Sequence, residues 1–292
     1  MNTELLNGHE IANSIKNDLK IIIAKRKLEG LRIPGLAMIL VGNNVSSEIY
    51  IEKKRNLCAE VGIKSQDFRF DKTVSKSTLV ELIKSLNDDY SIDGILLQLP
   101  LPVELNCNSI MQEILPHKDV DGFHPYNVGL LSIGNPLLRS CTAKAVMSLI
   151  KFTKIDIQGK HAVIIGASNI VGKPMAMEFI NSRCTVTICN SLTYDLPNII
   201  KQADIVVSAV GKPKIIRGDW IKFGAIVLDV GINKLPNGEI VGDVDFASAI
   251  GKASWITPVP GGVGPMTVVT LIENTIYAAE NFYKLRKYLC NY

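Results

Sequence analysis

The residue of this sequence best suited to acid–base chemistry is Lys54. It lies in the segment 41–63, which is predicted to continue a buried strand into a helix. Tyr50, Lys54, Leu57 and Val61 are spaced so that they share one face of that helix. Two interpretations of a lysine in an otherwise apolar stripe stay open here. Either its stem packs on apolar neighbours while the ammonium reaches water, or the amine lies in a partly desolvated pocket and acts as a base.

Two more polar side chains stand where ligands usually bind. Gln98 ends the predicted strand DGILLQL, and open α/β sheets bind ligands at the carboxyl ends of their strands, although a hydrogen bond to a loop explains Gln98 equally well. Asp121 precedes a glycine in a turn-rich stretch and is placed to offer a carboxylate to paired N–H donors. Asp119 has a turn-stabilising role as its simpler explanation. No companion cluster has metal-ligand spacing, so no metal is expected.

A second candidate site is a glycine turn that follows the strand HAVIIG. The turn GASNIVGKP contains Gly166, then Ser168 in place of a second glycine, and Gly172 one residue later than in the usual fingerprint. A helix and the strand CTVTIC follow, which completes a βαβ unit whose helix N-terminus receives a pyrophosphate. That strand ends in NSLT (190–193), without the acid that binds both ribose hydroxyls of NAD, which favours NADP.

The elements that must position these residues alternate between helix and strand along the whole chain. This alternation predicts an α/β fold of two domains with parallel, helix-flanked sheets. Other expected elements are helices at about 8–28, 73–86, 142–153 and 266–288, and a strand at 35–41. Ser46 or Ser47 is expected to cap the Lys54 helix and Gly62 to end it. The turn-rich stretch 116–131 is interpreted as a domain crossing, and 258–264 as a stiff, glycine-lined loop.

Composition limits the class of protein. The chain has 292 residues, 47% of them hydrophobic, and a net charge of +4, which is enough apolar material for two cores and too little charge to favour nucleic acid. Six cysteines, without zinc-like spacing, are typical of buried thiols in a reducing cytoplasm (Cys58, Cys107, Cys141, Cys184, Cys189 and Cys290). No secretory leader and no membrane-length apolar run is recognised, so a cytoplasmic globular protein is expected.

Taken together, these motifs resemble a known family. VGNNVSSEIYIEKK, DGILLQLPLP, KDVDGFHPYNVG, GASNIVGKP, DVGIN and TPVPGGVGPMT occur in the order found in bifunctional methylenetetrahydrofolate dehydrogenase/methenyltetrahydrofolate cyclohydrolases. The resemblance spans nearly the whole chain. It implies a homodimer without nucleic-acid or membrane partners. It also implies a folate-binding catalytic domain of residues 1–139 plus 267–292, and an NADP-binding Rossmann domain of residues 140–266.

The resemblance also assigns roles. Lys54, Gln98 and Asp121 are the implied catalytic residues: the lysine handles the proton of the attacking water, the glutamine holds the lysine, and the aspartate anchors the pterin. The implied folate-binding set adds Tyr50, Leu99, Pro260, Gly261 and Gly262. The implied cofactor-binding set is Thr142, Gly166, Ala167, Ser168, Ser191 and Ile232. The implied reaction is oxidation of 5,10-methylenetetrahydrofolate with NADP⁺, followed by hydrolysis of the methenyl product to 10-formyltetrahydrofolate.

Three departures keep alternatives open. The segment 140–145 reads SCTAKA where many relatives have Pro-Cys-Thr-Pro-x-Gly, and Ala167 and Leu192 replace basic residues that some relatives carry for the 2′-phosphate. Lys173 is the nearest candidate to compensate. The alternatives are an NAD-linked dehydrogenase without hydrolysis, which is expected to lack the lysine, and a folate- or nucleotide-binding regulator without turnover.

Overall fold

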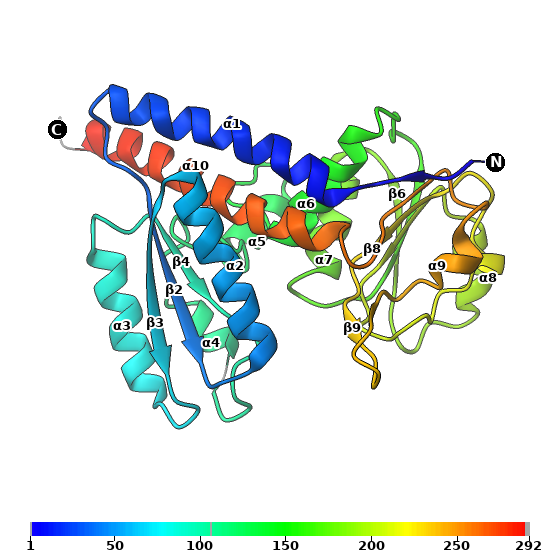
Figure 1. Cartoon of the computed structure of the whole chain (residues 1–292), viewed down its shortest axis with the longest axis horizontal. Helices are drawn as coiled ribbons and strands as arrows, with labels where there is room; N and C mark the ends of the chain where they lie inside the picture. Colours follow the sequence, from blue (N-terminus) through cyan, green and yellow to red (C-terminus); the bar gives the residue numbers. More distant parts are fainter. Residues whose placement is uncertain (1, 106, 290–292) are drawn as a thin grey trace. The chain divides into compact units, whose positions relative to one another are not determined.

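The computed structural model describes residues 2–105 and 107–289, and the chain forms two compact units. One unit contains residues 1–13 and 142–267, and the other contains residues 14–141 and 268–292. We call them the nucleotide unit and the lysine unit. Each has its own parallel sheet with helices around it (Figure 1).

The lysine unit is built on a three-stranded parallel sheet in the order β3-β2-β4. All seven residues of β2 are buried, as expected of a central strand covered on both faces. Its residues 37, 39 and 41 pack on the buried side chains of α3, which are Leu79, Ile83 and Leu86. The elements are β2 (Gly35–Val41), α2 (Val45–Val61), β3 (Lys64–Phe70), α3 (Lys76–Asp88), β4 (Gly94–Leu97), α4 (Cys107–Met111) and α5 (Pro125–Ser132).

The nucleotide unit contains a six-stranded sheet in the order β1-β11-β8-β7-β5-β6, in which every pairing is parallel. A hairpin of β9 and β10 is separate from it. The strands are β1 (Glu4–Leu5), β5 (His161–Ile165), β6 (Thr185–Cys189), β7 (Ile205–Ser208), β8 (Ile226–Asp229), β9 (Asn233–Lys234), β10 (Ile240–Val241) and β11 (Trp255–Ile256). The helices are α6 (Cys141–Phe152), α7 (Gly172–Asn181), α8 (Leu196–Lys201) and α9 (Phe246–Ala249), with a short 3₁₀ turn at Gly218–Trp220.

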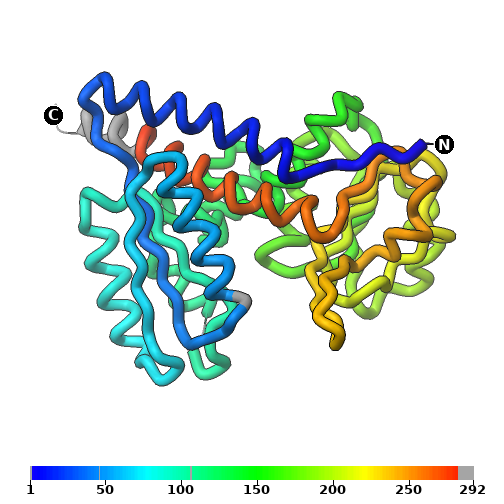
Figure 2. Tube along the Cα trace, viewed as in Figure 1, coloured from blue at the N-terminus to red at the C-terminus, as the bar shows by residue number. Residues whose placement is uncertain are grey.

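Two of the three boundaries between the units fall inside long helices, α1 (Gly8–Leu28) and α10 (Val263–Leu289), and the third falls at the start of α6. The N-terminus differs from the prediction, since residues 1–13 group with the nucleotide unit and not with the rest of 1–139. The reason is that β1 pairs in parallel with β11, as the blue and orange segments of Figure 2 show. Two residues of strand are too short to be recognised from periodicity alone.

The start of the Lys54 helix also differs from the prediction. Asn44 caps α2, and its side-chain oxygen accepts the N–H of Ser47 at 3.1 Å, so neither predicted serine is the cap. An asparagine at this position satisfies one of the free N–H groups of the first turn. Gly62 ends the helix as predicted, with φ at +89°.

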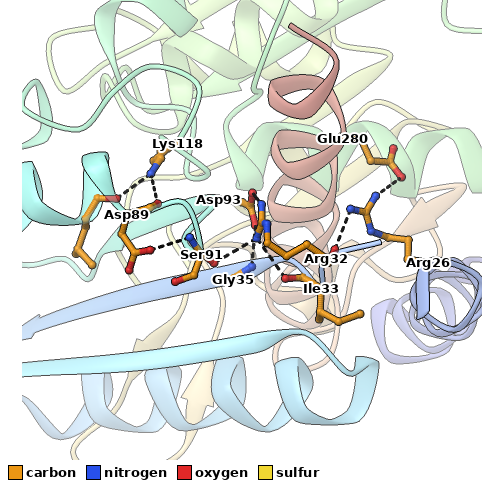
Figure 3. A network of polar contacts seen from close by, with 10 residues as sticks. Arg26, Arg32, Ile33, Gly35, Asp89, Ser91, Asp93, Lys118 and Glu280 are labelled. Atoms are coloured by element: carbon orange, nitrogen blue, oxygen red, sulfur yellow. Dashed lines mark hydrogen bonds and ion pairs between the residues drawn. The ribbon is translucent and has the colours of Figure 1, made fainter. Parts of the chain in front are cut away.

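A polar network fastens the amino ends of β2 and β4 (Figure 3). The buried Asp93 carboxylate accepts two hydrogen bonds from the Arg32 guanidinium and one from the Gly35 N–H at 2.8 Å. The buried Lys118 ammonium donates to the carbonyl oxygens of Leu86 and Asp89, both at 2.8 Å. Burial lowers the pKa of Lys118, while the nearby aspartates act in the opposite direction.

Candidate active site

Lys54 and Gln98 meet in the lysine unit. The Lys54 ammonium, projecting from α2, donates to the Gln98 side-chain oxygen at 2.9 Å, just beyond the carboxyl end of β4. The Gln98 amide nitrogen donates to the Leu99 carbonyl oxygen at 2.8 Å, which fixes the amide with its oxygen toward the lysine. Lys54 and Gln98 are both half-buried. Lys54 therefore has a specific polar partner 44 residues away in sequence, which simple snorkelling does not require.

Asp121 belongs to the same cluster. Burial raises the pKa of the Asp121 carboxyl to about 6; the positive charge of Lys54 acts against this rise and the negative charge of Asp119 adds to it. The segment that carries it bridges to β4 between Ile95 and Asp119, which aligns residues 119–121 with the strand. Gly94 makes this approach possible, because a Cβ there would lie 2.6 Å from a methyl carbon of Val120.

Asp119 has the turn-stabilising environment that the sequence suggested as its simpler role. Its carboxylate is buried and accepts the His124 N–H and the Asn127 side-chain N–H, both at 2.8 Å. Among residues 2–105 and 107–289, no group of three or more His, Cys, Asp or Glu side chains is placed to hold a metal ion. None of the five cysteines in those ranges forms a disulfide, and Cys290 lies outside them.

Tyr50 and Leu99 complete the predicted folate set of the lysine unit. Tyr50 is half-buried one turn before Lys54 on α2, and burial raises the pKa of its phenol. The Lys53 ammonium lies 5.9 Å from the centre of its ring. The Leu99 carbonyl oxygen accepts the buried Ser47 hydroxyl at 3.4 Å, and the Leu99–Pro100 peptide bond is cis. The other four predicted residues of this unit are thus connected to Lys54 by position or by hydrogen bonds (Tyr50, Gln98, Leu99 and Asp121).

The glycine turn of the nucleotide unit has the shape that a dinucleotide site needs. A Cβ at Gly166 (φ +117°) would lie 2.3 Å from the Ala209 carbonyl oxygen, and one at Gly172 would lie 1.9 Å from the Gly166 carbonyl oxygen. Both positions therefore require glycine. The exposed Ser168 hydroxyl accepts the N–H groups of Val171 at 3.1 Å and Gly172 at 3.4 Å, which closes the turn before α7.

The loop after β6 offers neutral polar groups at the carboxyl edge of the sheet. Asn190 and Ser191 are exposed, and the loop is closed by a 2.8 Å bond from the Asn190 N–H to the Thr193 hydroxyl. The Leu192 side chain is 91% exposed and adds no charge. Lys173, in the first turn of α7, is exposed, and its ammonium donates to the Asn169 side-chain oxygen at 2.7 Å. The fit to a dinucleotide is good, with Lys173 as the cation of this turn.

The remaining predicted residues also belong to the nucleotide unit. Thr142 lies in the first turn of α6, which begins inside the unusual 140–145 segment. Ile232 follows β8 with a 50% exposed side chain. The loop 260–262 packs on the start of α1, because a Cβ at Gly8 would lie 1.7 Å from the Gly262 carbonyl oxygen.

Comparison with known proteins shows that this chain matches two family models. A model described as "Tetrahydrofolate dehydrogenase/cyclohydrolase, catalytic domain" matches residues 6–121. A second, "Tetrahydrofolate dehydrogenase/cyclohydrolase, NAD(P)-binding domain", matches residues 140–283. The chain belongs to the tetrahydrofolate dehydrogenase/cyclohydrolase family. The predicted family, its two-domain α/β fold and its two enzymatic activities are thereby confirmed.

Solved structures agree with membership of the tetrahydrofolate dehydrogenase/cyclohydrolase family. The bifunctional methylenetetrahydrofolate dehydrogenase/cyclohydrolase of Campylobacter jejuni is 47% identical, with a TM-score of 0.93 over 96% of this chain and 99% of that one. The Trypanosoma brucei enzyme, solved with NADP and an inhibitor, is 36% identical, with a TM-score of 0.93 over 97% and 99%. The bifunctional enzyme of Thermoplasma acidophilum is 34% identical, with a TM-score of 0.89 over 95% and 98%.

Two buried acids of this family member escaped the sequence analysis. Asp229 ends β8 and Asp243 follows β10, and their side chains are 3% and 0% exposed. Burial raises the pKa of Asp229 to about 6. The available signal was an aspartate within two residues of a glycine, in DVG and GDV. Such pairs are also common in ordinary turns, so no local pattern distinguishes these two aspartates.

Proposed function

We propose that this chain oxidises 5,10-methylenetetrahydrofolate with NADP⁺ and hydrolyses the methenyl product to 10-formyltetrahydrofolate, with Lys54, Gln98 and Asp121 as its catalytic residues. The observation that carries these roles is the 2.9 Å bond between the Lys54 ammonium and the Gln98 amide oxygen, beside the Asp121 carboxyl. A dehydrogenase without hydrolysis has no need of this pair.

The chemistry assigns one task to each group. Bound NADP⁺ would supply the acceptor for the hydride of the methylene bridge. In the hydrolytic step a water oxygen bonds to the methenyl carbon, and one water proton passes to Lys54 in its free-amine form. The proton left on the adduct oxygen then moves to the departing folate nitrogen as the bond from that nitrogen to the carbon breaks, which leaves the formyl group. Gln98 holds the lysine at the attacking water, and Asp121 orients the pterin through its N–H groups. Tyr50, Leu99 and the loop Pro260–Gly262 contact the folate.

NADP is the proposed cofactor in preference to NAD. The loop Asn190–Thr193 offers hydroxyl and amide groups and lacks the carboxylate that would repel a 2′-phosphate. Lys173, exposed in the neighbouring turn, supplies a positive charge. Gly166, Ala167 and Ser168 contact the pyrophosphate, while Ser191 contacts the ribose, and Thr142 and Ile232 contact the nicotinamide side.

The protein is further proposed to be a cytoplasmic homodimer of one-carbon metabolism, serving purine and amino-acid biosynthesis. Within residues 2–105 and 107–289, no helix combines the length and the hydrophobicity that a membrane crossing requires. One edge of the six-stranded sheet, β6, presents a candidate dimer surface, because Ile188 on it and Ile180 on the adjacent α7 are 38% and 49% exposed. An edge strand with exposed apolar side chains is suited to pair with a second copy.

The test combines two assays on the purified chain. Reduced-nicotinamide absorbance is followed after methylenetetrahydrofolate is mixed with NADP⁺ or with NAD⁺, and methenyltetrahydrofolate hydrolysis is followed separately. We expect a faster signal with NADP⁺ and efficient hydrolysis. A preference for NAD⁺ would contradict the cofactor assignment, and no signal with either from protein that binds folate would favour the regulator.

The role of Lys54 is tested by Lys54→Met, which keeps the apolar stem and removes the amine. Cyclohydrolase turnover should fall by about 10²- to 10⁴-fold, the usual worth of a positioned acid–base group, with a smaller loss of dehydrogenase turnover. Lys84→Met, at an exposed position of α3, is the control and should leave both activities intact. Full hydrolysis by Lys54→Met would refute the assignment.

A further inference from the structure

Two buried aspartates of the nucleotide unit have no role in the chemistry described above, yet they adjoin its glycine turn. The backbone N–H of Asp243 donates to the Asp229 carboxylate at 3.0 Å, so Asp229 is bonded to the backbone of the residue that carries the second carboxylate. Burying one carboxylate is costly unless hydrogen-bond donors replace its water, and burying two together is more so. The surrounding structure must therefore supply hydrogen-bond donors to both carboxylates.

Asp243 accepts five hydrogen bonds, four from the stretch 208–212 and one from Asn233. One carboxylate oxygen accepts the Ser208 hydroxyl at 3.2 Å and the N–H groups of Val210 at 2.8 Å and Gly211 at 3.2 Å. The other accepts the Lys212 N–H at 3.0 Å and the Asn233 side-chain N–H at 2.9 Å. Three consecutive backbone N–H groups thus converge on one anion, as in a backbone anion-binding nest.

The Asp229 carboxylate also accepts hydrogen bonds from backbone N–H groups. Its oxygens accept the N–H groups of Gly231 at 2.9 Å and Val244 at 2.8 Å. A Cβ at Gly231 would lie 2.1 Å from an Asp243 oxygen, and one at Gly242 would lie 1.9 Å from an Asp229 oxygen. The two carboxylates therefore occupy space that only glycine leaves open, and we call this arrangement the aspartate latch.

The latch reaches two parts of the cofactor edge. Val210 follows Ala209, whose carbonyl oxygen lies against Gly166 and whose N–H donates to the Ile165 carbonyl oxygen at 2.8 Å. On the other side, Gly231 and Asn233 flank Ile232. The loop that supports the glycine turn and the two residues that flank Ile232, the residue proposed to face the nicotinamide, are therefore bonded to these two carboxylates.

We propose that Asp243, braced by Asp229, is a positioning residue that sets the spacing between the Gly166 turn and Ile232 for the dinucleotide. This inference rests on the proposed NADP site at that edge. Neutral asparagine at 243 would turn an N–H₂ group toward N–H donors on one side of the carboxylate, so two or three of the five bonds would be lost. The loops would then lose their shared anchor while the sheet below them stays paired.

The experiment uses full-length Asp243→Asn protein, with NADP⁺ binding measured by calorimetry and both activities assayed. The Kd and the KM for NADP⁺ should rise about tenfold, the effect of misplacing binding groups by a fraction of an ångström. Cofactor-free hydrolysis of methenyltetrahydrofolate should stay within about twofold of wild type, because Lys54, Gln98 and Asp121 belong to the other unit.

Val206→Ala is the matched control, since this buried β7 residue lies outside the latch and its truncation lowers the stability of the same sheet. Asn233→Ala, which removes one donor at a half-buried position, serves if Asp243→Asn does not fold, and should raise the KM for NADP⁺ about threefold. Wild-type affinity in Asp243→Asn, an equal loss in Val206→Ala, or an unchanged KM in Asn233→Ala would overturn the proposal. A wild-type protein that binds neither NADP⁺ nor NAD⁺ would instead refute the cofactor site on which the proposal rests.

Discussion

At the scale of single residues, the contrast between Asp119 and Asp121 shows how environment divides two similar side chains. Both are acids of the KDVDG segment, and burial raises the pKa of each carboxyl. Asp119 is bonded to the His124 and Asn127 N–H groups, which commits it to the turn. Asp121 lies in the field of the Lys54 ammonium, and it is the acid of the cluster that we propose binds the pterin.

A pH prediction follows for Asp121. Its pKa of about 6 means that the carboxylate is ionised above pH 6 and protonated below it. Because a pterin N–H needs the ionised acceptor, the KM for methylenetetrahydrofolate should rise up to about tenfold per pH unit below pH 6. Steady-state kinetics between pH 5 and 8 should show this rise in wild type and a flat, already raised KM in Asp121→Asn.

The pH should affect stability in the opposite direction to folate binding: a lower pH weakens folate binding but stabilises the folded protein at Asp121. A folded pKa raised above the ordinary value of 3.8 favours the protonated form, so this stabilising contribution is fully present below about pH 3.8 and is lost as the pH rises through about 6. Above pH 6, Asp121→Asn should therefore unfold at a higher temperature than wild type. Asp71→Asn, at an exposed position of the same unit, should change neither profile. A pH-independent KM in wild type would contradict the anchoring role of Asp121.

At the scale of elements, β2 and β4 are held in register at their amino ends by Asp93 (Figure 3). The Asp93 side chain is 2% exposed and bonded to Arg32 and to the Gly35 N–H. Asp93→Ala leaves these donors without their acceptor, and leaving a buried donor unsatisfied costs about 1–3 kcal/mol of unfolding free energy.

Urea unfolding of Asp93→Ala should therefore show a clearly lower midpoint with unchanged slope. Glu29→Ala, which breaks the exposed Lys25–Glu29 pair of α1, should cost less than about 1 kcal/mol. Equal urea midpoints for the two variants would show that Asp93 does not stabilise the pairing of β2 with β4.

At the scale of the whole molecule, the proposed dimer surface at β6 can be tested by charge. Ile188→Lys places an ammonium on the exposed side of this edge strand, where a partner strand would bury it. Sedimentation velocity should show wild type at twice the monomer mass and Ile188→Lys as monomer. Phe223→Lys, 64% exposed at a different place in the unit, should remain dimeric. A monomeric wild type would refute the dimer, and a dimeric Ile188→Lys would refute the surface.

The local elements and the family could both be predicted from the sequence. Helix α1 spans Gly8–Leu28 and strand β2 spans Gly35–Val41, as predicted, because apolar periodicity and glycine stops are properties of neighbouring residues. Long motifs in a fixed order carried the family resemblance for the same reason. The nucleotide turn was likewise identifiable, since strand, glycines and helix follow one another directly.

Which distant groups meet depends on the folded chain and could not be predicted from local patterns. The bond from Lys54 to Gln98 spans 44 residues, and the pairing of β1 with β11 spans about 250, so no local pattern contains either. The aspartate latch could not be predicted from the sequence for a related reason. A buried carboxylate is recognised by the donors that surround it, and those donors are backbone N–H groups, which every sequence position carries alike and only the fold directs to one point.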